Sequence, residues 1–180
     1  TVKVQSCREP LDAQAVGNVS YGLQGMTSEA PEVRALLSAL TVKVQSCREE
    51  LKAQEVGNAL YGLQGMTCEA PEVLALLYAL TAKVQSCRDE LNAQAVGNAL
   101  YGLQGMTSDA PVVRAMLSAL ATKVQSCTKE LNPQQIGNAL YGLCVLISGL
   151  LKGDERDASA ILQRVVTELD RYGQIDIFVQ

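Results

Sequence analysis

A repeat of 40 residues runs through most of this 180-residue chain and limits the folds that it can adopt. A Gly–Asn pair, two further residues and the segment YGLQGM begin at Gly17, Gly57 and Gly97, and a fourth copy opens at Gly137 before it diverges. Periods in this range are typical of stacked repeats, in which each unit buries its apolar face only against its neighbours. We therefore predict tandem helical units at 1–40, 41–80, 81–120 and 121–151, followed by a C-terminal capping helix and tail at 152–180.

The first half of each unit has the pattern of an amphipathic helix. Between Ser28 and Leu51, apolar residues follow one another at alternating steps of four and three, which is helical spacing. Ser28 is the expected cap, and Pro31 falls in the first turn, where no backbone donor is required. The apolar stripe comprises Val33, Leu37, Leu40, Val44, Cys47 and Leu51.

A second, shorter helix is predicted to follow, from about Ala93 to Gln104 in the third unit. Asn92 is a good N-cap, as is Asn132 in the fourth unit, whereas Lys52 is a weaker one. Gly105 is placed to end the helix in a left-handed turn. Two helices in every unit predict an all-α protein, an α-solenoid of stacked helical pairs whose last helix continues towards Leu151.

Glycines inside the second helix are unfavourable unless packing requires them. Gly97 and Gly102 each cost roughly 1 kcal/mol relative to alanine in a helix interior. Because they recur in every unit, we expect helix backbones to approach one another closely at these positions.

Polar and aromatic residues recur on the outer side of the second helix and form candidate ligand-binding rows. Stacked tyrosines and carboxamides could contact the bases of single-stranded RNA. Alternatively, the asparagines bridge adjacent units and the tyrosines fill gaps between helices, since identical residues in every unit suit a structural role. The rows contain Gln54, Asn58 and Tyr61, then Gln94, Asn98 and Tyr101, and Asn138 and Tyr141 in the fourth unit.

The first helix carries the positions that vary between units. Arg34 in the first unit is replaced by Leu74 in the second and returns as Arg114 in the third, and Tyr78 stands where the other units have serine. An apolar pair on a polar stripe is a candidate anchor for a protein partner. Isolated exposed apolar residues are also common on protein surfaces, and this interpretation stays open.

A row of lysines, Lys43, Lys83 and Lys123, is a candidate for phosphate contacts. The alternative is that these lysines pair with nearby acidic residues at the end of the first helix. The net charge of −4 favours this alternative, because no overall positive field draws the chain to nucleic acid.

No residue pattern in the sequence indicates catalysis or metal binding. The chain has no histidine, no Cys-x-x-Cys spacing and no phosphate-binding glycine loop, so we expect neither an enzyme, nor a metal site, nor a cofactor. Cys7, Cys47, Cys87 and Cys127 lie in register, about a helix-packing distance apart, which is too far for disulfides. We expect buried thiols in a reducing, intracellular compartment and no membrane span.

The run LNAQAVGNALYGL, from Leu91 to Leu103, resembles the octotricopeptide repeat family. That family has a core motif of glutamine, asparagine, leucine, an aromatic residue, a small residue and leucine. Here the motif is matched by Gln94, Asn98, Leu100, Tyr101, Gly102 and Leu103. The resemblance implies an α-solenoid in a chloroplast or mitochondrion that binds RNA in transcript processing, stability or translation.

Two functions therefore remain in view. The first is a non-catalytic scaffold that binds a protein partner in an organellar complex, which the acidity, the Leu74–Tyr78 pair and the uniform units favour. The second is single-stranded RNA binding, which the family resemblance implies. Because Thr1 aligns with Thr41, inside a predicted helix, we also expect the sequence to begin within a longer repeat array.

Overall fold

The computed structural model describes residues 9–107, 109–128, 130–150, 163 and 166–167. Within these residues the chain forms seven helices and no strand. The predicted capping helix and tail at 152–180 lie outside the described residues except for positions 163, 166 and 167, and Cys7 lies outside them altogether.

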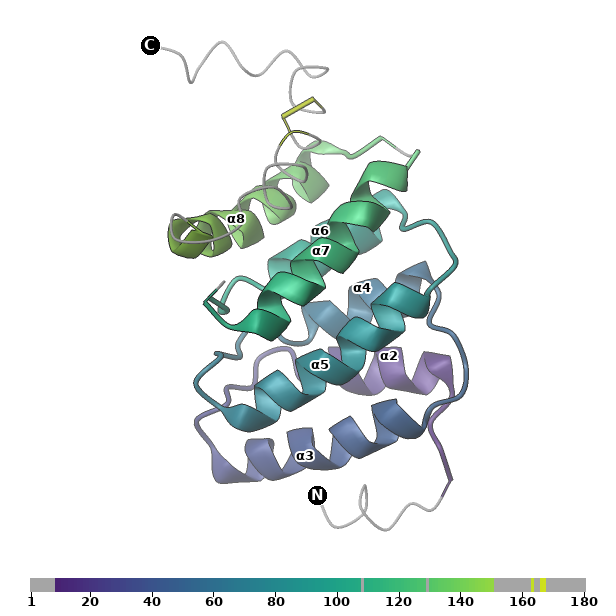
Figure 1. Ribbon diagram of the computed structural model, residues 1–180, viewed down its shortest axis with the longest axis vertical. Coiled ribbons are helices and arrows are strands. Elements are labelled where there is room, and N and C mark those ends of the chain that lie inside the picture. The colour runs from purple at the N-terminus through teal and green to yellow at the C-terminus, as the bar shows by residue number, and fades with distance from the viewer. Residues whose placement is uncertain (1–8, 108, 129, 151–162, 164–165, 168–180) are drawn as a thin grey trace.

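The helices form two rows (Figure 1). One row contains the first helices of the units, which all start at a proline: α3 (Pro31–Ser46), α5 (Pro71–Ser86) and α7 (Pro111–Ser126). The other row contains the second helices: α2 (Ala13–Tyr21), α4 (Ala53–Tyr61), α6 (Ala93–Gly102) and α8 (Pro133–Leu150). Each helix packs chiefly on the neighbouring helix of its own row, α2 on α4, α4 on α6, α6 on α8, α3 on α5 and α5 on α7.

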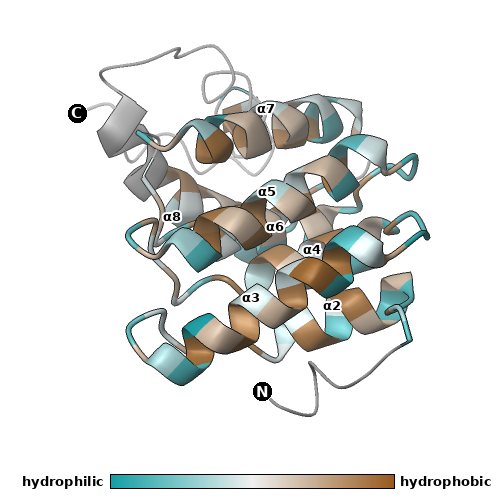
Figure 2. Ribbon diagram, turned by 60° about the horizontal axis from the view of Figure 1, so that its bottom comes forward, coloured by the Kyte–Doolittle hydropathy of each residue, from teal (hydrophilic) through white to brown (hydrophobic). Residues whose placement is uncertain are grey.

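The apolar core lies between the two rows, and polar residues concentrate at the helix ends and in the connecting loops (Figure 2). Full burial of a leucine side chain contributes about 1.5–3 kcal/mol, so this leucine-rich interior is the main source of stability. The largest fully buried side chains include Leu37, Leu40, Leu60, Leu63, Leu76, Leu77, Leu80 and Leu100.

The first helix of each unit is shorter than predicted. It begins at Pro31, not near Ser28, and it ends at Ser46, because Cys47 adopts an extended conformation with ψ of 120°. Leu51 is nonetheless 1% exposed, so its place in the apolar stripe reflects a loop that turns back into the core. Ser28 does not cap the helix; its hydroxyl instead accepts a hydrogen bond from the main-chain N–H of Thr67, with an N–O distance of 3.3 Å.

The predicted caps of the second helices are confirmed. The side chain of Asn92 accepts a hydrogen bond from the N–H of Ala95 at 2.8 Å, and Asn132 accepts one from Gln135 at 2.9 Å. Lys52 makes no side-chain cap; here the carboxylate of Glu55 accepts a hydrogen bond from the N–H of Lys52 at 2.8 Å. The predicted extension of the last helix towards residue 151 is also confirmed by α8.

The glycines within the second helices lie at close backbone contacts, as predicted, with the exception of Gly137 in α8. A methyl group added at Gly102 would overlap the main-chain carbonyl oxygen of Leu60, and one at Gly142 would overlap that of Leu100. The prediction of a left-handed Gly105 was wrong: among the described glycines only Gly25 has a positive φ, of 107°. The main chain at Gly105 instead passes close to the carbonyl group of Met66.

Ser20 is a buried defect in this packing, and its replacement should stabilise the protein. Its side chain is 0% exposed, its hydroxyl has no hydrogen-bond partner within the described part of the chain, and Leu60 and Leu100 occupy the matching positions of α4 and α6. We expect Ser20→Leu to raise the free energy of unfolding by about 2 kcal/mol, because it removes an unpaired polar group and buries apolar area.

Urea denaturation of wild type, Ser20→Leu and Ser20→Ala would measure this effect. Ser20→Ala removes the hydroxyl without adding volume, so it separates the polar contribution from the packing contribution. Destabilisation by Ser20→Leu would show that α2 does not pack on α4 as α4 packs on α6.

Candidate functional site

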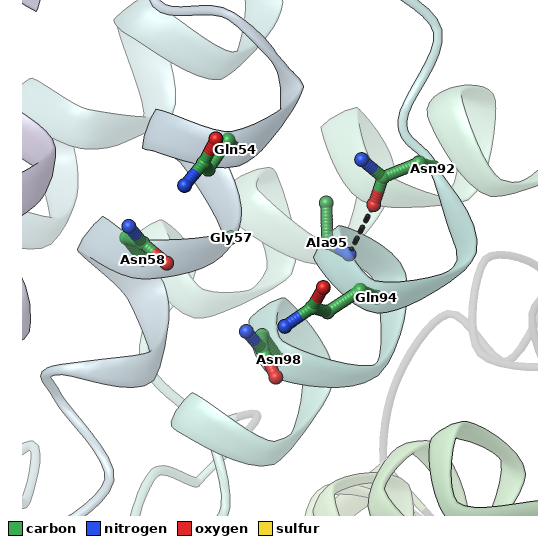
Figure 3. Close-up of a pocket in the computed structure, with 7 residues that line it drawn as sticks. All are labelled: Gln54, Gly57, Asn58, Asn92, Gln94, Ala95 and Asn98. Carbon is green, nitrogen blue, oxygen red and sulfur yellow. Dashed lines mark hydrogen bonds between the residues drawn. The ribbon is translucent and has the colours of Figure 1, made fainter. Parts of the chain in front are cut away.

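A polar pocket of about 150 Å³ lies between α4 and α6 (Figure 3). Each helix contributes a glutamine and an asparagine four residues apart, which places their side chains one helical turn apart on the same face. The residues that line the pocket are Gln54, Gly57, Asn58, Asn92, Gln94, Ala95 and Asn98.

The pocket owes its shape to the small residues between its polar walls. A Cβ atom at Gly57 would lie 2.8 Å from the Cα atom of Ala95, so any larger residue would push the two helices apart. Figure 3 shows Gln54 and Asn58 on α4 and Gln94 and Asn98 on α6, with Gly57 and Ala95 between the two pairs.

Four of the five carboxamides that line the pocket have no hydrogen-bond partner among the described residues. Gln54 and Gln94 are exposed, Asn58 and Asn98 are half-buried, and none of the four side chains makes a hydrogen bond to another described residue. Asn58 and Asn98 thus line the space between adjacent units without a direct hydrogen bond across it among the described residues. In the fourth unit, Asn138 is likewise half-buried.

The tyrosines of the second helices form one continuous stack. Ring centroids lie 5.5 Å apart between Tyr21 and Tyr61, 5.6 Å between Tyr61 and Tyr101, and 5.6 Å between Tyr101 and Tyr141. Offset stacking of this kind contributes about 0.5–1.5 kcal/mol per pair. The rings thus fill the space between neighbouring helices with one another, which favours the structural interpretation of this row.

The lysines are held by main-chain carbonyl groups. Lys83 donates to the carbonyl oxygens of Cys47 and of Glu49, the latter at 3.1 Å, and Lys123 donates to those of Cys87 and Asp89. Lys43 donates to the carbonyl oxygen of Glu9 at 2.9 Å. Each ammonium group thus ties one first helix to the loop before it along the stack, which is a structural use that neither interpretation of the sequence anticipated.

A second surface, an apolar groove of about 580 Å³, lies between α5 and the start of α7. Leu74 and Tyr78 of the predicted partner-binding set line it, and Tyr78 is 69% exposed. The remaining lining residues are Ala75, Ala110, Pro111, Val112 and Ala115.

The two arginines of the predicted partner-binding set are not among the residues that line this groove. Arg114 is half-buried and donates to the main-chain carbonyl oxygen of Asp109 at 3.0 Å. Arg34 is half-buried on α3, one helix further from the groove than α5.

The contribution of α7 to the groove was missed from the sequence. Val112 stands where the first two units have Glu32 and Glu72, and this change removes a charge from the groove edge. A comparison of residue 112 with residues 32 and 72 would have revealed this loss of charge from the sequence alone. Only the packing of α5 beside α7 shows that Val112 and Tyr78 share a surface.

Cys47, Cys87 and Cys127 are core residues that form no disulfide, as predicted, and the half-buried Cys68 forms none either. Cys47, Cys87 and Cys127 are each no more than 4% exposed. Burial raises the pKa of the Cys87 thiol, and it also raises the pKa of the half-buried Cys68 thiol. Both thiols therefore stay protonated at neutral pH, which makes them poor nucleophiles.

Among the described residues, no group of three or more Cys, Asp or Glu side chains is arranged to hold a metal ion. None of the helices described is both long enough and apolar enough to cross a membrane. Comparison with protein-family models, with curated proteins and with solved structures gives no match for this chain.

Proposed function

We propose that this chain is a non-catalytic α-solenoid of 40-residue units that acts as a scaffold for protein–protein assembly. Two features support the repeated architecture. The first helices begin at matching positions of the units, and so do the second helices. In addition, the main chain at Gly62, Gly102 and Gly142 packs against a carbonyl oxygen of the neighbouring second helix. The resemblance to octotricopeptide repeats adds an organellar complex as the expected setting.

The apolar groove between α5 and α7 is the observation that carries the protein-binding function. Its described lining is almost wholly apolar, and it includes Tyr78, a residue that is 69% exposed. Tyrosine is enriched among the residues that dominate binding energy in interfaces, because it offers a large area with few rotatable bonds. The groove therefore suits a protein partner that inserts an apolar side chain beside Tyr78.

The chain itself supplies a matched variant for testing this groove. Leu74→Arg combined with Tyr78→Ser installs the residues of the first and third units, so the fold should be retained. Peptides selected from a random displayed library on the wild-type protein should be rich in apolar residues. Their affinity for the double variant should fall by about 30-fold or more, because a hot-spot residue contributes at least about 2 kcal/mol.

Fluorescence anisotropy with the selected peptides would measure the affinities, and thermal melting would confirm that the double variant is folded. If no apolar peptide distinguishes wild type from the folded double variant, the groove is not a protein-binding site.

Single-stranded RNA binding is the second candidate, and the unengaged carboxamides of the polar pocket favour it, because such groups can bond base edges. The tyrosines and lysines favour it less, because the rings stack on one another and the ammonium groups bind main-chain carbonyl oxygens. Titration with mixed-sequence single-stranded RNA at low salt decides between the candidates. Micromolar binding that weakens steeply with salt would support RNA, and no binding at low salt would remove it.

A further inference from the structure

The row of carboxamides on the second helices presents a surface separate from the apolar groove, and we infer that it binds the main chain of an extended peptide. The observation is the juxtaposition of Gln54 and Asn58 with Gln94 and Asn98 around a pocket floored by Gly57 and Ala95 (Figure 3). The site lies on α4 and α6, whereas the apolar groove lies on α5 and α7, so the two can be tested independently.

The chemistry of the pocket selects a neutral ligand that both donates and accepts hydrogen bonds. Each carboxamide offers two N–H donors and one oxygen acceptor. No charged residue in the described part of the chain lines the pocket, and the oxygen of Asn92 is already bonded to the N–H of Ala95. A peptide main chain has the matching property, since every residue other than proline presents one N–H and one C=O.

The direction of the row also suits an extended chain. The row continues from one helix to the next, because Gln94 and Asn98 of α6 repeat the Gln54 and Asn58 of α4 around one pocket. An extended chain advances about 3.3 Å per residue, so the groups on one of its edges recur about every 6.6 Å. One strand that runs along the row can therefore present N–H and C=O groups to the carboxamides of both helices.

RNA fits this surface less well than a peptide does. Sequence-tolerant binding of single strands needs open aromatic faces and cations along the backbone. Here Tyr61 stacks on Tyr21 and on Tyr101, which leaves neither face of its ring open to a base. Among the described residues, the pocket has no basic lining residue to contact phosphate.

Alanine substitution of the two asparagines tests the assignment. Peptides from the random displayed library that bind wild type and keep their affinity for Leu74→Arg/Tyr78→Ser are the probes. We expect Asn58→Ala and Asn98→Ala each to weaken their binding about fivefold to tenfold, and the double variant about 50-fold, because each removes hydrogen bonds to the ligand. Alanine is the better helix former, so folding should not suffer.

Gln85→Ala is the matched control, because it removes an exposed carboxamide from α5, outside the pocket, and it should leave affinity unchanged. A second measurement uses synthetic peptides that carry N-methyl groups on alternate main-chain nitrogens. One register should abolish binding and the other should spare it, since only one edge of the strand faces the carboxamides.

Several outcomes would overturn the assignment. The library could yield no peptide of this class, both methylated registers could bind equally, or the asparagine variants could keep wild-type affinity. Binding of mixed single-stranded RNA at low salt that the same two variants abolish would assign the surface to RNA instead.

Discussion

Gly102→Ala is expected to destabilise the protein by about 3 kcal/mol or more, although alanine is the better helix former. The added methyl group would overlap the carbonyl oxygen of Leu60, and its next neighbours are the carbonyl carbon of Leu60 and the main-chain nitrogen of Tyr61. These are backbone atoms, so no side-chain rotation relieves the overlap, and α4 and α6 must move apart. Separation would also weaken the stacking of Tyr61 on Tyr101.

Gly137→Ala is the matched control and should have the opposite sign. Gly137 lies inside α8, and an added Cβ atom would meet no described atom within 4 Å. Without an overlap, the higher helix propensity of alanine is the main effect of the substitution, so the free energy of unfolding should rise by about 1 kcal/mol. Urea denaturation curves of both variants give the comparison; equal effects of one sign would mean that Gly102 does not sit at a helix contact.

The helices could be predicted from the sequence because their stability depends on a periodic apolar face. Val44 and Leu40 obey helical spacing and are buried in α3, as expected. The end of the helix could not be placed in the same way. Leu51 continues the spacing and is buried, yet it lies in a loop, since an apolar residue that a loop turns inward leaves the same pattern as one on a helix.

The candidate sites were harder to predict, because they depend on contacts between units. Spacing placed Asn58 and Tyr61 on one side of α4, and the structure brings both into rows with the neighbouring helices. The sequence of one unit does not reveal which of these side chains contacts its counterpart in the next unit. The tyrosine binds its counterpart, whereas the asparagine has no partner among the described residues, although both recur in every unit.

The lysine row shows the same dependence on neighbouring units. Lys83 has acidic residues near it in the sequence, and ion pairing was the favoured expectation. Its donors instead reach main-chain oxygens 34 and 36 residues earlier in the chain. A long-range contact of this kind becomes visible only once one unit is placed beside the next.

Removal of one whole unit should leave a folded protein, whereas removal of half a unit should not. Deletion of residues 41–80 joins Leu40 to Thr81 and so recreates the native sequence of a unit boundary. The third unit would then contact the first through the glycine and leucine positions that the second unit uses now. In a stacked array stability is a sum over units and their interfaces, so the shorter protein should remain helical but melt at a lower temperature.

Deletion of residues 41–60 removes fewer residues yet should be far more damaging. It joins the middle of a first helix to the end of a second helix, and it leaves the apolar face of α5 without its matching second helix. This protein should lose its cooperative melting transition, because no arrangement of the remaining helices restores the pairing of one row on the other.

Thermal melting of these two deletion proteins, followed by far-ultraviolet circular dichroism, is the most direct measurement of the proposed repeat. Cooperative melting after the larger deletion, together with its loss after the smaller one, is the expected result. Unfolding of both proteins, or equal stability of both, would contradict a fold built from interchangeable 40-residue units.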